Sequence, residues 1–214
     1  MPSGRSAGPG RPTSHFSPVQ ATQVVLVRHG RTEWSAAGRH TGRTDVPLTE
    51  AGRAEAKAVA DRLAALHVDR VLTSPLSRAA DTAALAGFGD RAEVRDELVE
   101  WDYGELDGRT TEQVRERYPG WTIWSGPVPG GESADDVGVR ADGILAEIAA
   151  SGLTVLVFSH AHFLRVLAAR WLELPPTAGA YFKLDTATVS VLGYERERRV
   201  LFGWNQSCPG GSPG

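Results

Sequence analysis

The chain has 214 residues, of which 41% are hydrophobic and 23% are charged, and its formal net charge is −3. This size predicts one domain with a full core, and the near-neutral charge excludes a general attraction to nucleic acid or to an anionic membrane. The single cysteine, Cys208, excludes an internal disulfide and a cysteine zinc site, and no apolar run reaches the roughly 20 residues that span a bilayer. We therefore expect a cytoplasmic protein.

Both ends of the chain are rich in proline, glycine and serine. Eleven of the first 20 residues are of these types, and the chain ends in Ser-Cys-Pro-Gly-Gly-Ser-Pro-Gly. Such segments bury too little apolar surface to offset the entropy of ordering them. The sequence therefore predicts flexible tails at residues 1–22 and 207–214, on either side of one domain at 23–206.

Between the tails, strand patterns alternate with helix patterns. This alternation predicts an α/β fold, a three-layer α/β/α sandwich around a mostly parallel central sheet. In chain order, the predicted elements are a buried strand at 23–28, a helix at 49–67, a short strand at 70–74, a helix at 78–86, an edge-like strand at 94–99, a helix at 133–150, a second buried strand at 154–159, a helix at 162–172, and closing strands at 186–194 and 199–204.

Histidines and arginines follow three of the predicted strands. Arg28 and His29 come directly after the first buried strand, His160 comes directly after the second, and Arg78 lies shortly after the strand at 70–74. Ligands of such sheets bind outside the carboxyl ends of the strands. Guanidinium groups bind phosphate oxygens in pairs, and a neutral imidazole attacks phosphorus as a nucleophile. The constellation therefore predicts a phosphoryl site.

The segments around these residues resemble the histidine phosphatase superfamily, in the branch that includes cofactor-dependent phosphoglycerate mutases. Five blocks carry the resemblance and occur in the family's order: Leu26–Trp34, His40–Ala56, Thr73–Ala79, Glu97–Gly104 and Phe158–His160. Within this family the chain is most similar to mutase-like mycobacterial acid phosphatases and to the sedoheptulose bisphosphatase subgroup. Ala161 departs from this subgroup, which has glycine between its two histidines.

The resemblance implies a phosphoglycerate mutase-like fold and a role for each matching residue. It implies that His29 is the nucleophile that becomes phosphohistidine and that Glu100 gives a proton to the leaving alcohol. Arg28, Arg78 and His160 are implied to complete the catalytic pocket around the phosphoryl oxygens. Neither a metal ion nor another cofactor is implied. The residues implied to bind substrate are Arg28, Arg78, Ser35, Thr41, Gly42, Tyr103 and His162.

Without the resemblance, several residues have plainer interpretations. Glu100 lies in an acidic segment typical of a solvated face. A substrate contact and a helix-start role are equally weighted for His162, and His40 is interpreted as a loop residue. Three tryptophans either line the pocket or pack a cap, with packing preferred: Trp101, Trp121 and Trp124.

The favoured function is a phosphoric monoester hydrolase that needs no metal and acts on small phosphorylated metabolites, such as sugar phosphates or phosphoglycerates. Mutases hold a bisphosphate with paired arginines, whereas Glu116 separates Arg115 from Arg117 here, and Ser35 stands where mutases have asparagine. Two alternatives stay open, a cofactor-dependent phosphoglycerate mutase and a non-catalytic phosphate-binding regulatory protein. The predicted partner is a small-molecule phosphate ester, with neither nucleic acid nor membrane, and a homodimer is left open.

Overall fold

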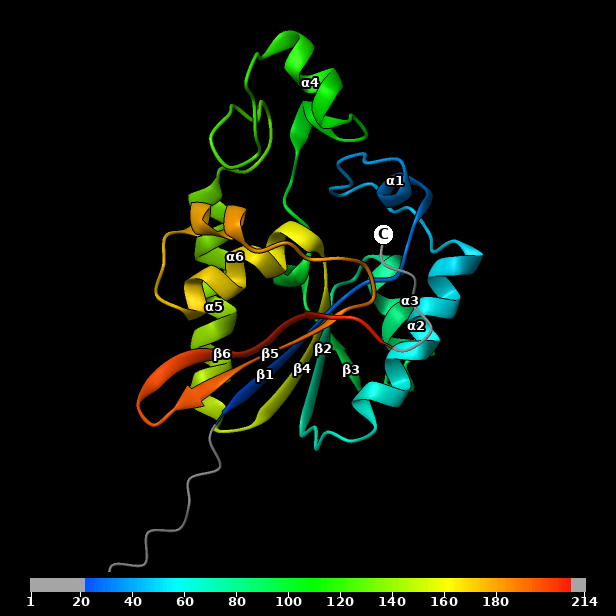
Figure 1. Cartoon of the computed structure of the whole chain (residues 1–214), viewed down its shortest axis with the longest axis vertical. Coiled ribbons are helices and arrows are strands. Elements are labelled where there is room, and N and C mark those ends of the chain that lie inside the picture. The colour runs from blue at the N-terminus through cyan, green and yellow to red at the C-terminus, as the bar shows by residue number, and fades with distance from the viewer. Residues whose placement is uncertain (1–21, 209–214) are drawn as a thin grey trace, which may run out of the picture.

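Residues 22–208 are described by a computed structural model, shown in Figure 1. Residues 1–21 and 209–214, which make up most of the two predicted tails, lie outside the described residues. At the borders of the described part, Thr22 and Cys208 are both buried. The Cys208 thiol packs beside the carbonyl oxygen of Ala187, so the folded chain continues past the predicted boundary at residue 206.

A six-stranded sheet forms the middle layer, with the strand order β3-β2-β4-β1-β5-β6. The pairs β3–β2, β2–β4 and β4–β1 are parallel, whereas β5 runs antiparallel to β1, and β6 runs antiparallel to β5. The strands are β1 (Gln23–Arg28), β2 (Arg70–Thr73), β3 (Ala92–Val94), β4 (Thr154–Ser159), β5 (Val189–Glu195) and β6 (Arg198–Gln206).

Helices cover both faces of the sheet, which confirms the predicted three-layer α/β/α fold (Figure 1). On one face lie α2 (Glu50–Leu63) and α3 (Ser77–Leu85), and on the other α5 (Ala134–Ser151) and α6 (Ala161–Trp171). Alternate residues of β1 belong to two separate hydrophobic cores. Leu26 packs in the core that includes α5 and α6, and Val25 packs in the core that includes α2 and α3. The short helices α1 (Glu33–Ala36) and α4 (Thr111–Arg117) lie beyond the carboxyl ends of the parallel strands (Figure 1).

Three of the predicted elements differ from the structure by three residues or more, and one of them is the strand predicted at 186–194, which begins only at Val189. The helix predicted to reach residue 67 ends at Leu63, where Ala64 caps it. The strand predicted at 94–99 is wrong, because β3 stops at Val94 and residues 96–98 form a 3₁₀ helix. The reason is that Leu98 and Val99 are both buried, whereas Val94 is exposed, and the turn in which Leu98 N–H donates to Arg95 O at 3.1 Å brings both side chains inward.

Candidate active site

The two histidines of the predicted site meet because their strands are neighbours. In the parallel pair β1–β4, Arg28 lies opposite Ser159, so His29 and His160 leave the sheet at the same level. The backbone N–H of His29 donates to the carbonyl of Ser159 at 3.0 Å. The two imidazole centroids lie 5.2 Å apart. Both side chains are buried. The structure therefore brings together two histidines that lie more than a hundred residues apart in the sequence.

The hydrogen bond of His29 leaves one ring nitrogen available. Nδ1 lies 2.7 Å from the carbonyl oxygen of Gly30. A carbonyl can only accept, so Nδ1 carries the proton and Nε2 carries a lone pair. Burial, reinforced by the positive charges of Arg28 and Arg78, holds the pKa of His29 well below its usual value. The ring therefore stays neutral and nucleophilic below the pH at which an exposed histidine becomes charged.

His160 is held in the opposite tautomer. The Nε atom of Arg78 donates to His160 Nδ1 at 3.2 Å, so His160 Nε2 carries the proton and donates to the hydroxyl of Ser74 at 2.8 Å. Burial, followed by the nearby charge of Arg78, lowers the pKa of His160 well below its usual value. The sequence analysis missed Ser74, although it is the residue that follows the strand β2 and was part of the block that carries the family resemblance.

Arg78 is fully buried and binds backbone oxygens rather than an acid. Its Nη1 donates to Thr44 O at 2.9 Å, and its Nη2 donates to Gly42 O at 2.8 Å and to Thr41 O at 3.2 Å. Because these carbonyls occupy one edge of the guanidinium plane, they fix its orientation toward His160. The charge itself is left without a carboxylate partner within residues 22–208.

Arg28 is the less engaged of the two guanidinium groups. Nη1 donates to the carbonyl of Leu184 at 2.7 Å, and the buried Nε has no hydrogen-bond partner in the described part of the chain. Burial lowers the pKa of both Arg28 and Arg78 from their usual values, the effect expected for cations taken out of water without a counter-ion. Both positive charges lie near the His29 ring, whose pKa they lower, and these three side chains together define a positively charged recess.

Glu100 is buried across the pocket from these cations, and three backbone N–H groups hold its carboxyl group. Trp101 and Phe163 donate to Oε1 at 2.9 and 2.8 Å, and His162 donates to Oε2 at 3.1 Å. His162 and Phe163 lie in the first turn of α6, whose backbone N–H groups lack partners within the helix. Glu100 therefore caps α6 from outside the helix, which the acidic segment alone did not indicate.

Tyr103 and His162 form a hydrogen-bonded pair beside Glu100. The Tyr103 hydroxyl lies 2.6 Å from His162 Nδ1. Burial, and then the charge of Glu100, raises the pKa of Tyr103, so its hydroxyl keeps its proton and donates it. Burial lowers the pKa of His162 well below its usual value, and its neutral ring consequently carries its proton on Nε2. The ring of His162 is packed among His40, Trp101 and Trp124.

These groups surround a pocket of about 170 Å³. Three residues implied by the resemblance do not line the pocket, namely Gly42, Arg78 and His160. Arg78 and His160 are fully buried, and the Gly42 carbonyl is bound to the Arg78 side chain. His40, interpreted from the sequence as a loop residue, does line it. The lining residues are Arg28, His29, Ser35, Gly38, Arg39, His40, Thr41, Glu100, Tyr103, Ala161 and His162.

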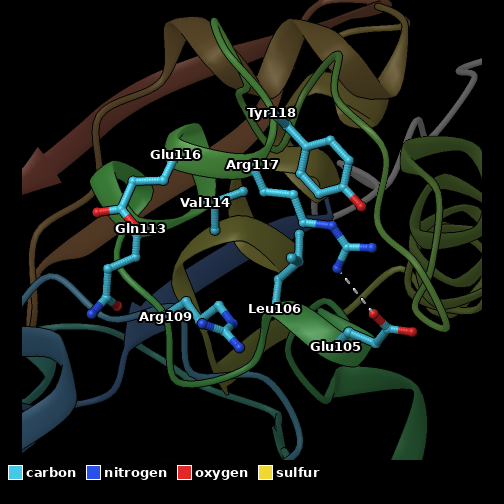
Figure 2. Close-up of a pocket in the computed structure, with 8 residues that line it drawn as sticks. All are labelled: Glu105, Leu106, Arg109, Gln113, Val114, Glu116, Arg117 and Tyr118. Carbon is cyan, nitrogen blue, oxygen red and sulfur yellow. Dashed lines mark ion pairs between the residues drawn. The ribbon is translucent and has the colours of Figure 1, made fainter.

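A second, larger hollow of about 610 Å³ lies against α4 (Figure 2). Its floor contains the buried Leu106 and Val114, and Arg117 on its wall pairs with Glu105 at 3.6 Å. Arg115 is also engaged, since its Nε donates to Trp121 O at 2.9 Å. Neither arginine of α4 lines the pocket that holds His29, so neither forms a second phosphate clamp there.

Two negative findings concern residues 22–208. No helix of this part is long and apolar enough to cross a membrane. No group of three or more histidine, cysteine or acidic side chains in the same range has the arrangement of a metal site. Metal independence and a cytoplasmic location stay predictions.

Similarity to known proteins shows the family to which the chain belongs. Residues 24–207 match the model of the histidine phosphatase superfamily, branch 1. The chain belongs to this superfamily. An acid phosphatase of Mycobacterium tuberculosis is 42% identical over 86% of this chain and 92% of its own length. The chain is therefore a phosphoric monoester hydrolase, as the sequence predicted.

Two further relatives confirm the fold and widen the range of related activities. A solved structure of the product of an open reading frame of M. tuberculosis has a TM-score of 0.82 at 41% identity, and the match covers 86% of this chain and 97% of that chain. A probable phosphoglycerate mutase of Cronobacter sakazakii is 34% identical over 85% of this chain and 89% of its own length. The predicted family resemblance to phosphatases and mutases alike is thus confirmed.

Proposed function

We propose that the protein hydrolyses small phosphate monoesters through a phosphohistidine formed on His29. The observation that carries this proposal is the recess formed by Arg28 and Arg78, two guanidinium groups without a carboxylate partner beside a neutral imidazole whose Nε2 is free. Buried cations are costly unless an anion pairs with them. A phosphoryl group supplies that anion and places its phosphorus next to the nucleophile.

In the first half of the reaction, the Nε2 lone pair of His29 forms a bond to phosphorus as the bond from phosphorus to the ester oxygen breaks. Glu100, in its acid form, gives its proton to that oxygen, so that an alcohol leaves instead of an alkoxide. Arg28 and Arg78 stabilise the charge on the three equatorial oxygens, and this positioning and charge compensation provide most of the rate. Throughout both steps, His29 Nδ1 keeps its proton and donates it in a hydrogen bond to the Gly30 carbonyl.

In the second half, a water molecule attacks the phosphohistidine and gives a proton to the Glu100 carboxylate. The bond from phosphorus to Nε2 breaks, its electron pair returns to nitrogen, and inorganic phosphate leaves. His29 and Glu100 are then in their starting forms, and none of these steps uses a metal ion.

The size of the pocket supports a small leaving group. Its volume of about 170 Å³ is below the roughly 300–1,000 Å³ of sites that enclose a drug-sized ligand. Tyr103, His162 and His40 line this pocket together with His29 and would contact the leaving group. We therefore propose small phosphorylated metabolites, including sugar phosphates and phosphoglycerates, as the substrate class.

The test combines turnover with trapping of the intermediate. We expect wild-type protein, mixed rapidly with radiolabelled substrate and quenched in alkali, to retain a label that acid removes, as a phosphohistidine does. His29→Asn is expected to lose both the label and the turnover of p-nitrophenyl phosphate. His67→Asn is the matched control, because His67 is an exposed histidine whose only side-chain partner among residues 22–208 is Asp69. Substantial turnover by His29→Asn would refute the nucleophile, and an inactive wild type would favour the regulatory alternative.

Phosphoglycerate mutase activity is the second candidate, favoured by the 34% identical probable mutase. Against it, Arg115 and Arg117 are engaged elsewhere and do not line the pocket. Incubation with 3-phosphoglycerate and bisphosphoglycerate decides between the two. Isomerisation that is faster than phosphate release would overturn the phosphatase proposal.

A further inference from the structure

The backbone on both sides of Glu100 is held by two residues that lie outside the pocket, Arg140 on α5 and Glu132 just before that helix. They form an ion pair in which Arg140 Nε lies 2.7 Å from Glu132 Oε1 and Nη2 lies 2.8 Å from Oε2. Their side chains are 18% and 17% exposed, so solvent screens the pair only partly. Such two-point geometry is specific to a guanidinium group facing a carboxylate.

Arg140 also binds three backbone oxygens of the segment that leads into Glu100. Nη1 donates to Glu97 O at 2.6 Å and to Val99 O at 3.2 Å, and Nη2 donates to Glu100 O at 3.4 Å. One planar group thus joins a carboxylate on one side to three carbonyls on the other. Lysine, with a single nitrogen, cannot form this set of contacts.

Glu132 holds the segment that follows Glu100. The backbone N–H of Asp102 donates to Glu132 Oε2 at 2.9 Å, and the backbone N–H of Glu132 donates to Asp102 O at 2.9 Å. The indole N–H of Trp101 donates to Glu132 O at 2.8 Å. The Arg140–Glu132 pair therefore fixes the chain immediately before and immediately after Glu100.

Arg140 reaches the carboxyl group of Glu100 by a second route. Its guanidinium carbon lies 5.0 Å from the centre of the Phe163 ring, an arrangement in which cation and ring attract each other. The backbone N–H of Phe163 is one of the three donors to Glu100, at 2.8 Å. The same side chain therefore supports both the backbone that carries Glu100 and one of the groups that orient its carboxyl oxygens.

We propose that the Arg140–Glu132 pair is a positioning device for proton transfer by Glu100. The inference rests on the proposed function, in which Glu100 protonates the leaving oxygen. Neither residue touches substrate in this arrangement. We expect their loss to displace Glu100 while Arg28 and His29 stay in place, because those two side chains are held by separate contacts to Leu184 and Gly30.

The leaving group distinguishes this role from a general loss of structure. Nitrophenolate leaves readily without a proton, whereas an alkoxide needs one. A displaced Glu100 should therefore slow hydrolysis of an alkyl phosphate, such as glycerol phosphate, much more than hydrolysis of p-nitrophenyl phosphate. The ratio of the two kcat/KM values is measured on one protein sample, so the fraction of folded enzyme cancels from it.

The experiment compares this ratio in wild type, Glu132→Gln, Arg140→Lys and Glu100→Gln. For Glu100→Gln we expect a loss of about 10²- to 10⁴-fold on the alkyl ester, the usual contribution of a general acid, and a smaller loss on the nitrophenyl ester. For the two positioning variants we expect the ratio to shift in the same direction by at least about tenfold, within that range. Asp142→Asn is the control, since Asp142 lies on α5 like Arg140 but pairs with Arg170 on α6, and within residues 22–208 neither residue of this pair bonds to the Glu100 segment.

The outcomes distinguish a failure of the proposed function from a failure of the positioning role alone. If Glu100→Gln does not shift the ratio, Glu100 is not the proton donor and the proposed function fails at that residue. If it shifts the ratio while Glu132→Gln and Arg140→Lys lose activity equally on both esters, so that their ratio stays at the value of wild type and Asp142→Asn, the positioning role is overturned. Combining Glu132→Gln with Glu100→Gln provides a last check, because a pair that acts through Glu100 should produce no further shift once Glu100 is replaced.

Discussion

Three histidines of the site, two of them buried and His162 half-buried, make the stability of this fold depend on pH in a range where few other groups titrate. His29, His160 and His162 all have pKa values held well below the usual value, in each case chiefly by burial. In the unfolded chain they bind protons below about pH 6.5, whereas in the folded chain they stay neutral. The unfolded state therefore binds more protons as the pH falls, and acid must lower the free energy of unfolding.

The size of this effect follows from proton linkage. Each such histidine removes about 1.4 kcal/mol per pH unit once the pH is well below 6.5, and about 1.3 kcal/mol in total between about pH 7.5 and about pH 5.5. Three histidines give a loss of about 4 kcal/mol over this interval, a large part of the roughly 5–15 kcal/mol that keeps a domain folded. Hydrogen bonds from Arg70 lower the pKa values of Glu93 and Glu147, so these carboxylates add their own losses only at more acidic pH.

Urea unfolding at several pH values between these limits measures the effect. We expect the wild-type free energy of unfolding to fall by about 4 kcal/mol, and that of His162→Gln to fall by about one third less. Val59→Ala, a core substitution on the other face of the sheet, should lower stability equally at every pH. An equal fall in wild type and His162→Gln would refute the conclusion that His162 is held as a neutral group.

Further predictions concern catalysis. Arg78→Lys should reduce kcat by about 10²- to 10³-fold, because lysine cannot keep the bonds to Thr41, Gly42 and Thr44 while facing a phosphoryl group, and steady-state kinetics with p-nitrophenyl phosphate measures this loss. The pH–rate profile should extend into the acidic range, because the lowered pKa keeps His29 unprotonated there, and a rate that rises steadily into alkaline pH would contradict the assignment of Glu100 as an acid. Prolonged treatment with EDTA should leave turnover unchanged, and strong inhibition would point to a metal ion in the reaction.

The sequence predicted the elements whose hydrophobic pattern is set by burial on both faces of the sheet. The strands at 23–28 and 154–159 were predicted with the observed bounds, because each is an apolar run that only a central parallel strand accommodates. The segment at 94–99 failed because its apolar residues, Val94, Leu98 and Val99, do not share one strand face. Leu98 and Val99 are both buried, Leu98 in the core beside α5 and α6, and these are tertiary contacts.

Some residues of the candidate site could likewise be predicted from the sequence, and others could not. His29, His160 and Arg78 could be predicted to meet, since the carboxyl ends of neighbouring parallel strands meet at one edge. The pocket position of His40 could not, because it depends on how a loop folds over that edge. Nothing in the sequence indicates a role for Arg140, since a single arginine on an amphipathic helix is usually a solvated residue. Its contacts with the Glu100 segment come from packing between α5 and the loop.

Binding of an anion should reverse part of the acid sensitivity of the site. An anion held by Arg28 and Arg78 lies next to the rings of His29 and His160 and favours their protonated forms, so anion and protons should bind together. Sulfate is a suitable probe, because its own charge does not change over this pH range. Its dissociation constant should fall by up to about tenfold per pH unit for each proton taken up between about pH 7.5 and about pH 5.5. Calorimetric titration against chloride at equal ionic strength measures this, and His29→Asn should lose part of the pH dependence. A dissociation constant that does not change with pH would show that the anion binds away from the histidines, and the recess would then not be the phosphoryl site.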